Sequence, residues 1–147
     1  MTIGSPASVS ALPPLLVAAS AAVVFTLGAL HLWYTFRGNK LHPRDPELRA
    51  RLEQVPLVLT RQTTMWKAWI GFNASHSYGA LLFGAIYGYL ALVHAAFLFQ
   101  SWFLLWLGLL ALVAYAFLAK RYWFSVPFRG ILLAIAFYTG ALVAAVA

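Results

Sequence analysis

Apolar residues dominate four stretches of the chain in which charged positions are nearly absent, and each stretch is long enough to cross a membrane. We expect spans at about 11–36, 68–97, 102–119 and 130–147. About 20 helical residues, each rising about 1.5 Å, cross a hydrocarbon core of roughly 30 Å. The pattern predicts an all-α integral membrane protein, in which residues 1–147 form a single domain, a bundle of four transmembrane helices.

The composition supports this class. Hydrophobic residues make up 63% of the chain and charged residues 9%, whereas soluble domains average roughly a quarter charged residues. The chain has no cysteine, which excludes disulfides, thiolate metal ligands and cysteine nucleophiles. No basic region precedes the first span, as it would in a signal peptide, so we expect this span to be retained.

The positive charges indicate the topology. All ten Lys and Arg residues lie in two connections, 37–67 between the first two spans and 120–129 between the last two. The positive-inside rule places both connections in the cytoplasm and both termini on the non-cytoplasmic side. The formal net charge of +7 then reflects topology and contact with anionic lipid headgroups at the cytoplasmic face, and we expect no nucleic-acid partner. A multi-pass protein of the inner or plasma membrane of the cell is predicted.

The first basic connection contains the segment RDPELRARLEQVP, which is typical of a short helix. Asp45 is its expected N-cap, Pro46 its first residue, and Pro56 interrupts it. All three acidic residues of the protein lie here, so none lies inside a span. We expect a solvated or interfacial helix, with a lid over a membrane pocket as the alternative. Two i,i+4 ion pairs are expected along it, Glu47–Arg51 and Arg49–Glu53.

A stripe of small residues recurs every four positions on the second span, at Ala80, Gly84 and Gly88. Small residues let transmembrane helices approach closely. The stripe therefore predicts tight packing, either within the bundle or between subunits of an oligomer.

The second span also carries polar residues in the stretch WKAWIGFNASHSYGALLFG. At about 100° per residue, Trp69, Asn73 and His76 share one face of this helix, and His31 lies on a face of the first span. Counted from the nearest basic residue, His31 and Asn73 lie about 9 Å inward and His76 about 14 Å.

Tyr115 on the third span and Tyr138 on the fourth fall in the same layer by the same count. If these faces converge, they form a polar pocket in the cytoplasmic half of the bilayer, below a rim of basic residues. Polar residues inside a membrane are functional candidates, although Asn and His also form bonds between helices that only stabilise a bundle.

Several kinds of site fit this set of residues poorly. A zinc site usually needs three or four Cys, His or acidic ligands, and a Ser–His–acid triad lacks its acid. Proton-coupled transport typically uses intramembrane carboxylates, which the spans lack. We predict no metal and no cofactor, and bis-histidine haem ligation between the first two spans stays an open alternative.

A lipid or lipophilic molecule with an anionic head fits the residues best. Its tail would lie against Trp, Phe and Leu side chains, and its head near the basic rim, which includes Lys120. The candidate ligand-binding residues are His31, Asn73, His76, Trp69, Tyr115, Tyr138, Arg37, Lys67 and Arg129.

The layout resembles the membrane-associated proteins of eicosanoid and glutathione metabolism (MAPEG), a family that includes microsomal prostaglandin E synthase and microsomal glutathione transferases. The similar features are chain length, four spans, both termini outside, and a basic connection after the first span. The resemblance implies a homotrimer whose substrates meet between subunits in the cytoplasmic half.

At the residue level, the family's second-helix pattern R-x-x-R-A-H-x-N-x-x-E falls on WKAWIGFNASH, where Asn73 matches. His76 stands where the family has Glu, and Trp66 and Trp69 stand where it has Arg. The stretch 127–129 is similar to the Pro-x-Arg that opens the family's fourth helix, while 102–119 has no counterpart of the family's third-helix Arg. Glutathione is therefore not expected, because indoles replace the cations that hold it.

We favour a non-catalytic role, as a lipid-binding or scaffold protein, because no catalytic constellation is visible. The alternative is a MAPEG-like enzyme acting on a lipophilic substrate. In that case His76 would be the acid/base, Asn73 and Tyr138 would orient a polar head or oxyanion, and Arg129 would hold an anionic group. A small transporter or channel is the third hypothesis.

Overall fold

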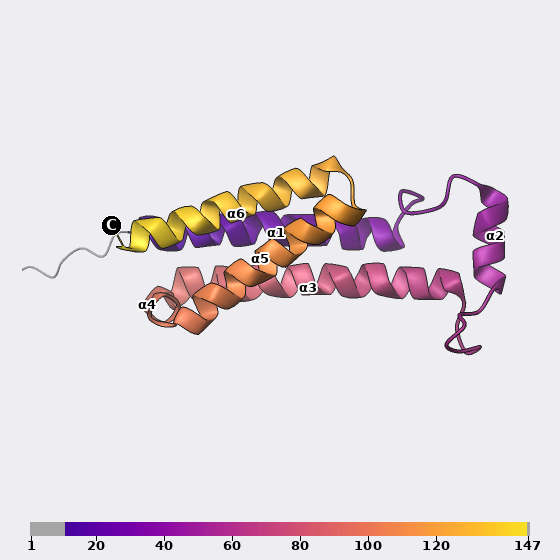
Figure 1. The fold of residues 1–147 in the computed structure, drawn as a ribbon, viewed down its shortest axis with the longest axis horizontal. Coiled ribbons are helices and arrows are strands. Elements are labelled where there is room, and N and C mark those ends of the chain that lie inside the picture. Colours follow the sequence, from indigo (N-terminus) through magenta and orange to yellow (C-terminus); the bar gives the residue numbers. More distant parts are fainter. Residues whose placement is uncertain (1–10, 147) are drawn as a thin grey trace, which may run out of the picture.

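The computed structural model describes residues 11–146, and its regular structure there is helical apart from one isolated β-bridge (Figure 1). Four helices, α1, α3, α5 and α6, are long and apolar enough to cross a membrane. The all-α class with four candidate spans, and with it a multi-pass membrane protein, is thereby confirmed. The helices are α1 (Leu12–Phe36), α2 (Pro46–Gln54), α3 (Met65–Val93), α4 (Ala95–Gln100), α5 (Trp102–Tyr122) and α6 (Ser125–Val146).

The spans differ from the predicted ones mainly at their ends. The second does not run on to 97, because the backbone leaves the helix at His94 and the short α4 follows. The fourth begins at Ser125 rather than at 130. Pro127 permits this earlier start, because proline is tolerated in the first turn of a helix, where the N–H donor that it lacks would have no intrahelical acceptor. Residue 147, the predicted end of this span, lies outside the described residues.

Helix α1 is the centre of the bundle: α3 and α6 both pack along it, and α5 crosses to pack on α6 (Figure 1). The contact between α1 and α3 is close because small residues face each other there. A Cβ added at Gly28 would lie 2.8 Å from the Ala80 Cβ, and one at Gly84 would lie 2.6 Å from the Phe25 Cβ. The small-residue stripe of α3 is therefore covered by α1 of the same chain.

One side-chain bond ties α1 to α6. The Ser20 hydroxyl, fully buried, donates to the Ala134 carbonyl at 2.8 Å. Large apolar side chains such as Phe72 and Phe103 point outward, 74% and 72% exposed. Such a surface suits a lipid environment, in which burying apolar side chains between helices gains little.

Helix α2 lies across the long axis of the bundle, at the end where α3 begins (Figure 1). Asp45 caps it as predicted, accepting from the backbone N–H groups of the second and third helical residues. The Arg49 guanidinium lies 3.7 Å from the centre of the Trp66 ring and 2.8 Å from His42 Nδ1, and it pairs with Glu53 at 2.7 Å.

These contacts of Arg49 hold α2 against the first turn of α3. The other predicted ion pair, Glu47–Arg51, does not form; within residues 11–146 the Arg49–Glu53 pair is the only salt bridge. Stacking on Trp66 and bonding to His42 fix the Arg49 side chain in a geometry that suits its pair with Glu53.

Candidate functional site

Two of the predicted polar residues are joined across the α1–α3 contact. His31 Nε2 on α1 lies 3.0 Å from Asn73 Oδ1 on α3, and Asn73 Nδ2 donates to the Trp69 carbonyl at 2.8 Å. Because an amide oxygen only accepts, His31 Nε2 is the donor in the first bond. Both polar atoms of the Asn73 side chain are thus engaged within the protein, which makes Asn73 the residue that orients His31.

His76, one turn further along α3, is enclosed by rings instead of hydrogen-bond partners. Its ring centre lies 5.5 Å from that of His31, 5.4 Å from that of Tyr115 and 4.6 Å from that of Trp123, each in an edge-to-face arrangement. We call His31, His76, Tyr115 and Trp123 the ring cluster. It joins α1, α3 and the C-terminal end of α5.

Two members of the ring cluster have polar groups without a hydrogen bond in the part of the chain that the structure describes. The His76 ring nitrogens have no such bond, and neither does the Tyr115 hydroxyl, which lies near Gly79. The His76 and Tyr115 side chains are each half-buried. An imidazole and a phenol held beside each other with free polar ends can bind a group that both donates and accepts.

The ring cluster lies at the level where α5 ends. Trp123 directly follows α5, whose last turn carries Lys120 and Arg121. Figure 1 shows that α3 continues well beyond the α5–α6 connection. His76, nine residues past Lys67 on α3, therefore lies at the level where α5 ends.

Tyr138 does not join the ring cluster. Its side chain is fully buried, and its hydroxyl donates to the Leu105 carbonyl at 3.0 Å, in the first turn of α5 and far from Trp123. The Tyr87 hydroxyl donates to the neighbouring Leu104 carbonyl at 2.8 Å. The predicted common layer was wrong for Tyr138, because α6 starts at Ser125 and thirteen residues place Tyr138 about 20 Å along it.

The other predicted residues lie outside the cluster. Trp69 Nε1 donates to the Leu41 carbonyl at 3.1 Å, which ties the 37–64 connection to α3. The Arg37 guanidinium lies 5.6 Å from the Trp33 ring centre. Lys67 and Arg129 are exposed. Among the predicted residues, the structure therefore brings together His31, Asn73, His76 and Tyr115.

Trp123 is the member of the ring cluster that the sequence did not indicate. Its position nevertheless carries a signal for the membrane–water boundary, because a tryptophan just beyond the basic end of a span is typical of that boundary. The contact with His76 depends on how α5 crosses α3, which no local pattern specifies.

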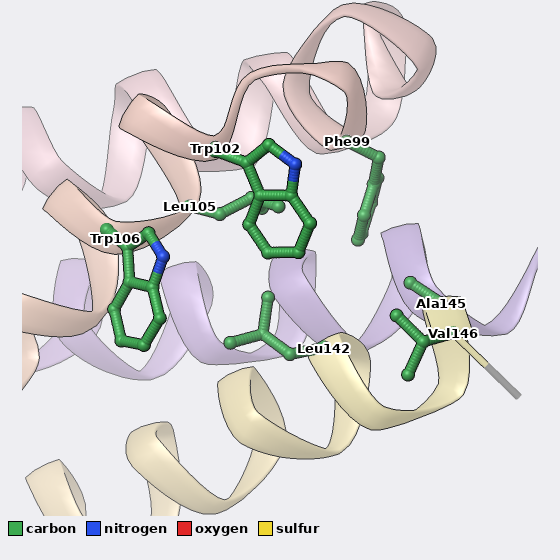
Figure 2. Close-up of a pocket in the computed structure, with 7 residues that line it drawn as sticks. All are labelled: Phe99, Trp102, Leu105, Trp106, Leu142, Ala145 and Val146. Carbon is green, nitrogen blue, oxygen red and sulfur yellow. The ribbon is translucent and has the colours of Figure 1, made fainter.

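Two hollows in the described surface lie away from the ring cluster. One, of about 290 Å³, is apolar and lies where α4, α5 and the end of α6 meet (Figure 2); it is lined by Phe99, Trp102, Leu105, Trp106, Leu142, Ala145 and Val146. The other, of about 280 Å³, lies beside α1 and is lined by Ala29, Leu32, Trp33, Phe36, Arg37 and Leu81. Within residues 11–146, no group of three or more His, Asp or Glu side chains gathers to hold a metal ion.

The His31–Asn73 bond is expected to stabilise the bundle measurably. Hydrogen bonds between transmembrane helices contribute about 0.6 kcal/mol on average and up to about 2 kcal/mol. We expect a double-mutant cycle of His31→Ala and Asn73→Ala, followed by unfolding in mixed micelles, to give a coupling energy in this range. Additive effects of the two substitutions would show that the bond contributes nothing to stability.

No protein-family model matches this sequence, and no curated protein or solved structure was found to be similar to it.

Proposed function

We propose that the protein binds a lipid or another lipophilic molecule whose polar group hydrogen-bonds to His76 and Tyr115, and that this binding is non-catalytic. The observation that carries the proposal is the free imidazole of His76, held by three rings within a transmembrane helix. The unbonded polar atoms of His76 and Tyr115 are not fully buried, so a polar group from outside the protein can reach them. A bound head group would supply the partner that the protein does not.

The surroundings of the ring cluster favour a head group with negative charge. Lys120 and Arg121 occupy the last turn of α5, directly before Trp123, and Arg129 is in the first turns of α6. At this level a phosphate or carboxylate can reach the cations while its neighbouring oxygens meet His76. The tail of the molecule would then run along the apolar outer faces of the helices.

The proposed topology places both basic connections in the cytoplasm and both termini outside. With this topology, the site opens to the cytoplasmic leaflet. Figure 1 supports this topology, because α1 begins and α6 ends at one end of the bundle, whereas the 37–64 connection lies at the other. A MAPEG-like homotrimer is part of the proposal. It rests on the resemblance alone, because α1 of the same chain covers the small-residue stripe, which is therefore not available as a contact between subunits.

An enzymatic role is the second candidate. The same free groups favour it, because an imidazole beside a phenol can move a proton at a bound lipophilic substrate. Asn73 would position His31 in this case, instead of orienting a polar head or oxyanion as expected from the sequence. The two candidates differ in whether the bound molecule is recovered unchanged.

Native mass spectrometry of the protein extracted in mild detergent, with lipid analysis of what stays bound, tests the proposal. We expect the wild-type protein to retain a stoichiometric lipophile and His76→Ala to lose it. His94→Ala is the matched control, because His94 is exposed at the far end of α3, where it bonds to Tyr89. Equal retention by all three proteins would contradict the proposal, and a chemically altered molecule would favour the enzyme.

A further inference from the structure

The loop between α2 and α3 presents two apolar side chains outside the bundle. Val58 is fully exposed and Leu59 is 90% exposed, more than any other large apolar residues among those described. They sit in the 37–64 connection, which carries six basic and three acidic residues. Exposed apolar side chains on such a polar segment are unexpected unless something covers them.

The loop is held in a defined shape. Pro56 and Thr64 form an antiparallel bridge at its base, and the Met65 N–H donates to the Val55 carbonyl at 2.9 Å. Within it, the Thr60 N–H donates to the Leu57 carbonyl at 3.3 Å. The turn that these bonds make directs Val58 and Leu59 away from α2 and α3.

The place of the loop points to the bilayer as the occupant. Figure 1 shows it projecting sideways past α3, at the level where α3 begins, instead of straight out from the end of the bundle. A segment beside the end of a transmembrane helix faces the lipid headgroups that surround that helix. Arg61, exposed two residues after Leu59, offers a charge for a lipid phosphate.

A protein partner fits less well. Two side chains cover far less than the roughly 1,200 Å² that stable protein interfaces bury in total. Insertion of two apolar side chains beside a basic residue into an anionic headgroup layer needs no such area. We infer that the 57–61 loop is a second membrane contact of this protein, in which Val58 and Leu59 enter the bilayer and Arg61 binds lipid phosphate.

The test uses single cysteines, since the chain has none of its own. The variants Val58→Cys and Leu59→Cys are each labelled with a nitroxide. The labelled proteins are then reconstituted into phosphatidylcholine vesicles with and without phosphatidylglycerol. Collisions of the label with oxygen and with a water-soluble nickel chelate are compared by electron paramagnetic resonance. Arg51→Cys on the exposed side of α2 is the control, because its side chain makes no contact that the structure records.

We expect labels at 58 and 59 to favour oxygen over the nickel chelate several-fold more than the control label does. Adding Arg61→Gln should reduce this preference in vesicles that contain phosphatidylglycerol and leave it unchanged in pure phosphatidylcholine. Labels as accessible to nickel as the control would overturn the inference. Spin–spin broadening between labels at 58 would also overturn it, by showing that a second copy covers the loop. Both outcomes are independent of lipid binding at His76.

Discussion

Replacing Gly84 with leucine is expected to separate α1 from α3 and to destabilise the protein more than any other single change considered. A Cβ at this position would lie 2.6 Å from the Phe25 Cβ and 2.8 Å from the Ala21 carbonyl oxygen. The nearest atoms belong to or adjoin the backbone of α1, so a side-chain rotation cannot relieve the clash. Overpacking of this kind costs about 3 kcal/mol or more when the backbone has to move.

Gly71→Leu is the matched control on the same helix. Nothing lies within 4 Å of a Cβ added at Gly71. Leucine is also a better helix former than glycine by roughly 0.5–1 kcal/mol, so this variant should unfold at or slightly above the wild-type temperature. Thermal unfolding in detergent, followed by far-UV circular dichroism, compares the two. Similar melting temperatures for both variants would contradict the close α1–α3 contact.

The second large effect is expected at Tyr138. Its ring fills the space beside Gly108 and Tyr87, and its hydroxyl donates to the Leu105 carbonyl at 3.0 Å. Tyr138→Ala leaves a cavity that the surrounding helices fill only in part, at a cost of about 2–4 kcal/mol. Tyr138→Phe removes only the hydrogen bond, which contributes about 1 kcal/mol between transmembrane helices.

Unfolding in mixed micelles should therefore rank the variants, with Tyr138→Ala least stable and Tyr138→Phe between it and the wild type. Tyr78→Ala is the control, because Tyr78 is 54% exposed on α3 and its loss leaves no cavity. If Tyr138→Phe were as unstable as Tyr138→Ala, the hydroxyl rather than the ring would make the main contribution of Tyr138 to stability. If Tyr138→Ala matched the control, Tyr138 would be no part of the core.

The spans were predictable because the signal is continuous. A stretch of about 20 apolar residues has few folded alternatives to a transmembrane helix. The N-cap at Asp45 was also predictable, because its signal lies in adjacent residues of the sequence. The end of α3 was missed because the residues after Val93 stay apolar, so hydropathy carries no break at His94. The sequence indicated that the stripe with Ala80 and Gly84 is a close-packing surface of α3. It did not indicate that α1 is the helix that packs on it.

The candidate site was predictable only in part. Helical phase correctly brought Asn73 and His76 toward the helix that carries His31, since α1 and α3 are long and pack directly along each other. Depth counting failed for Tyr138, because α3 and α6 extend to different levels and the start of α6 was misplaced. Trp123 reaches His76 through the crossing of α5 over α3, a tertiary relation that residue spacing does not encode.

The most direct test of the central claim is the hydrogen bonding of His76 itself. The protein has four histidines, so nitrogen-15 labelling of histidine and two-bond nitrogen–proton NMR resolve each ring, with His76→Ala assigning the signal. We expect the His76 nitrogens to shift when delipidated protein is returned to its native membrane lipids, while the His42 and His94 signals stay in place. A His76 signal that is identical with and without those lipids would contradict a ligand at the ring cluster.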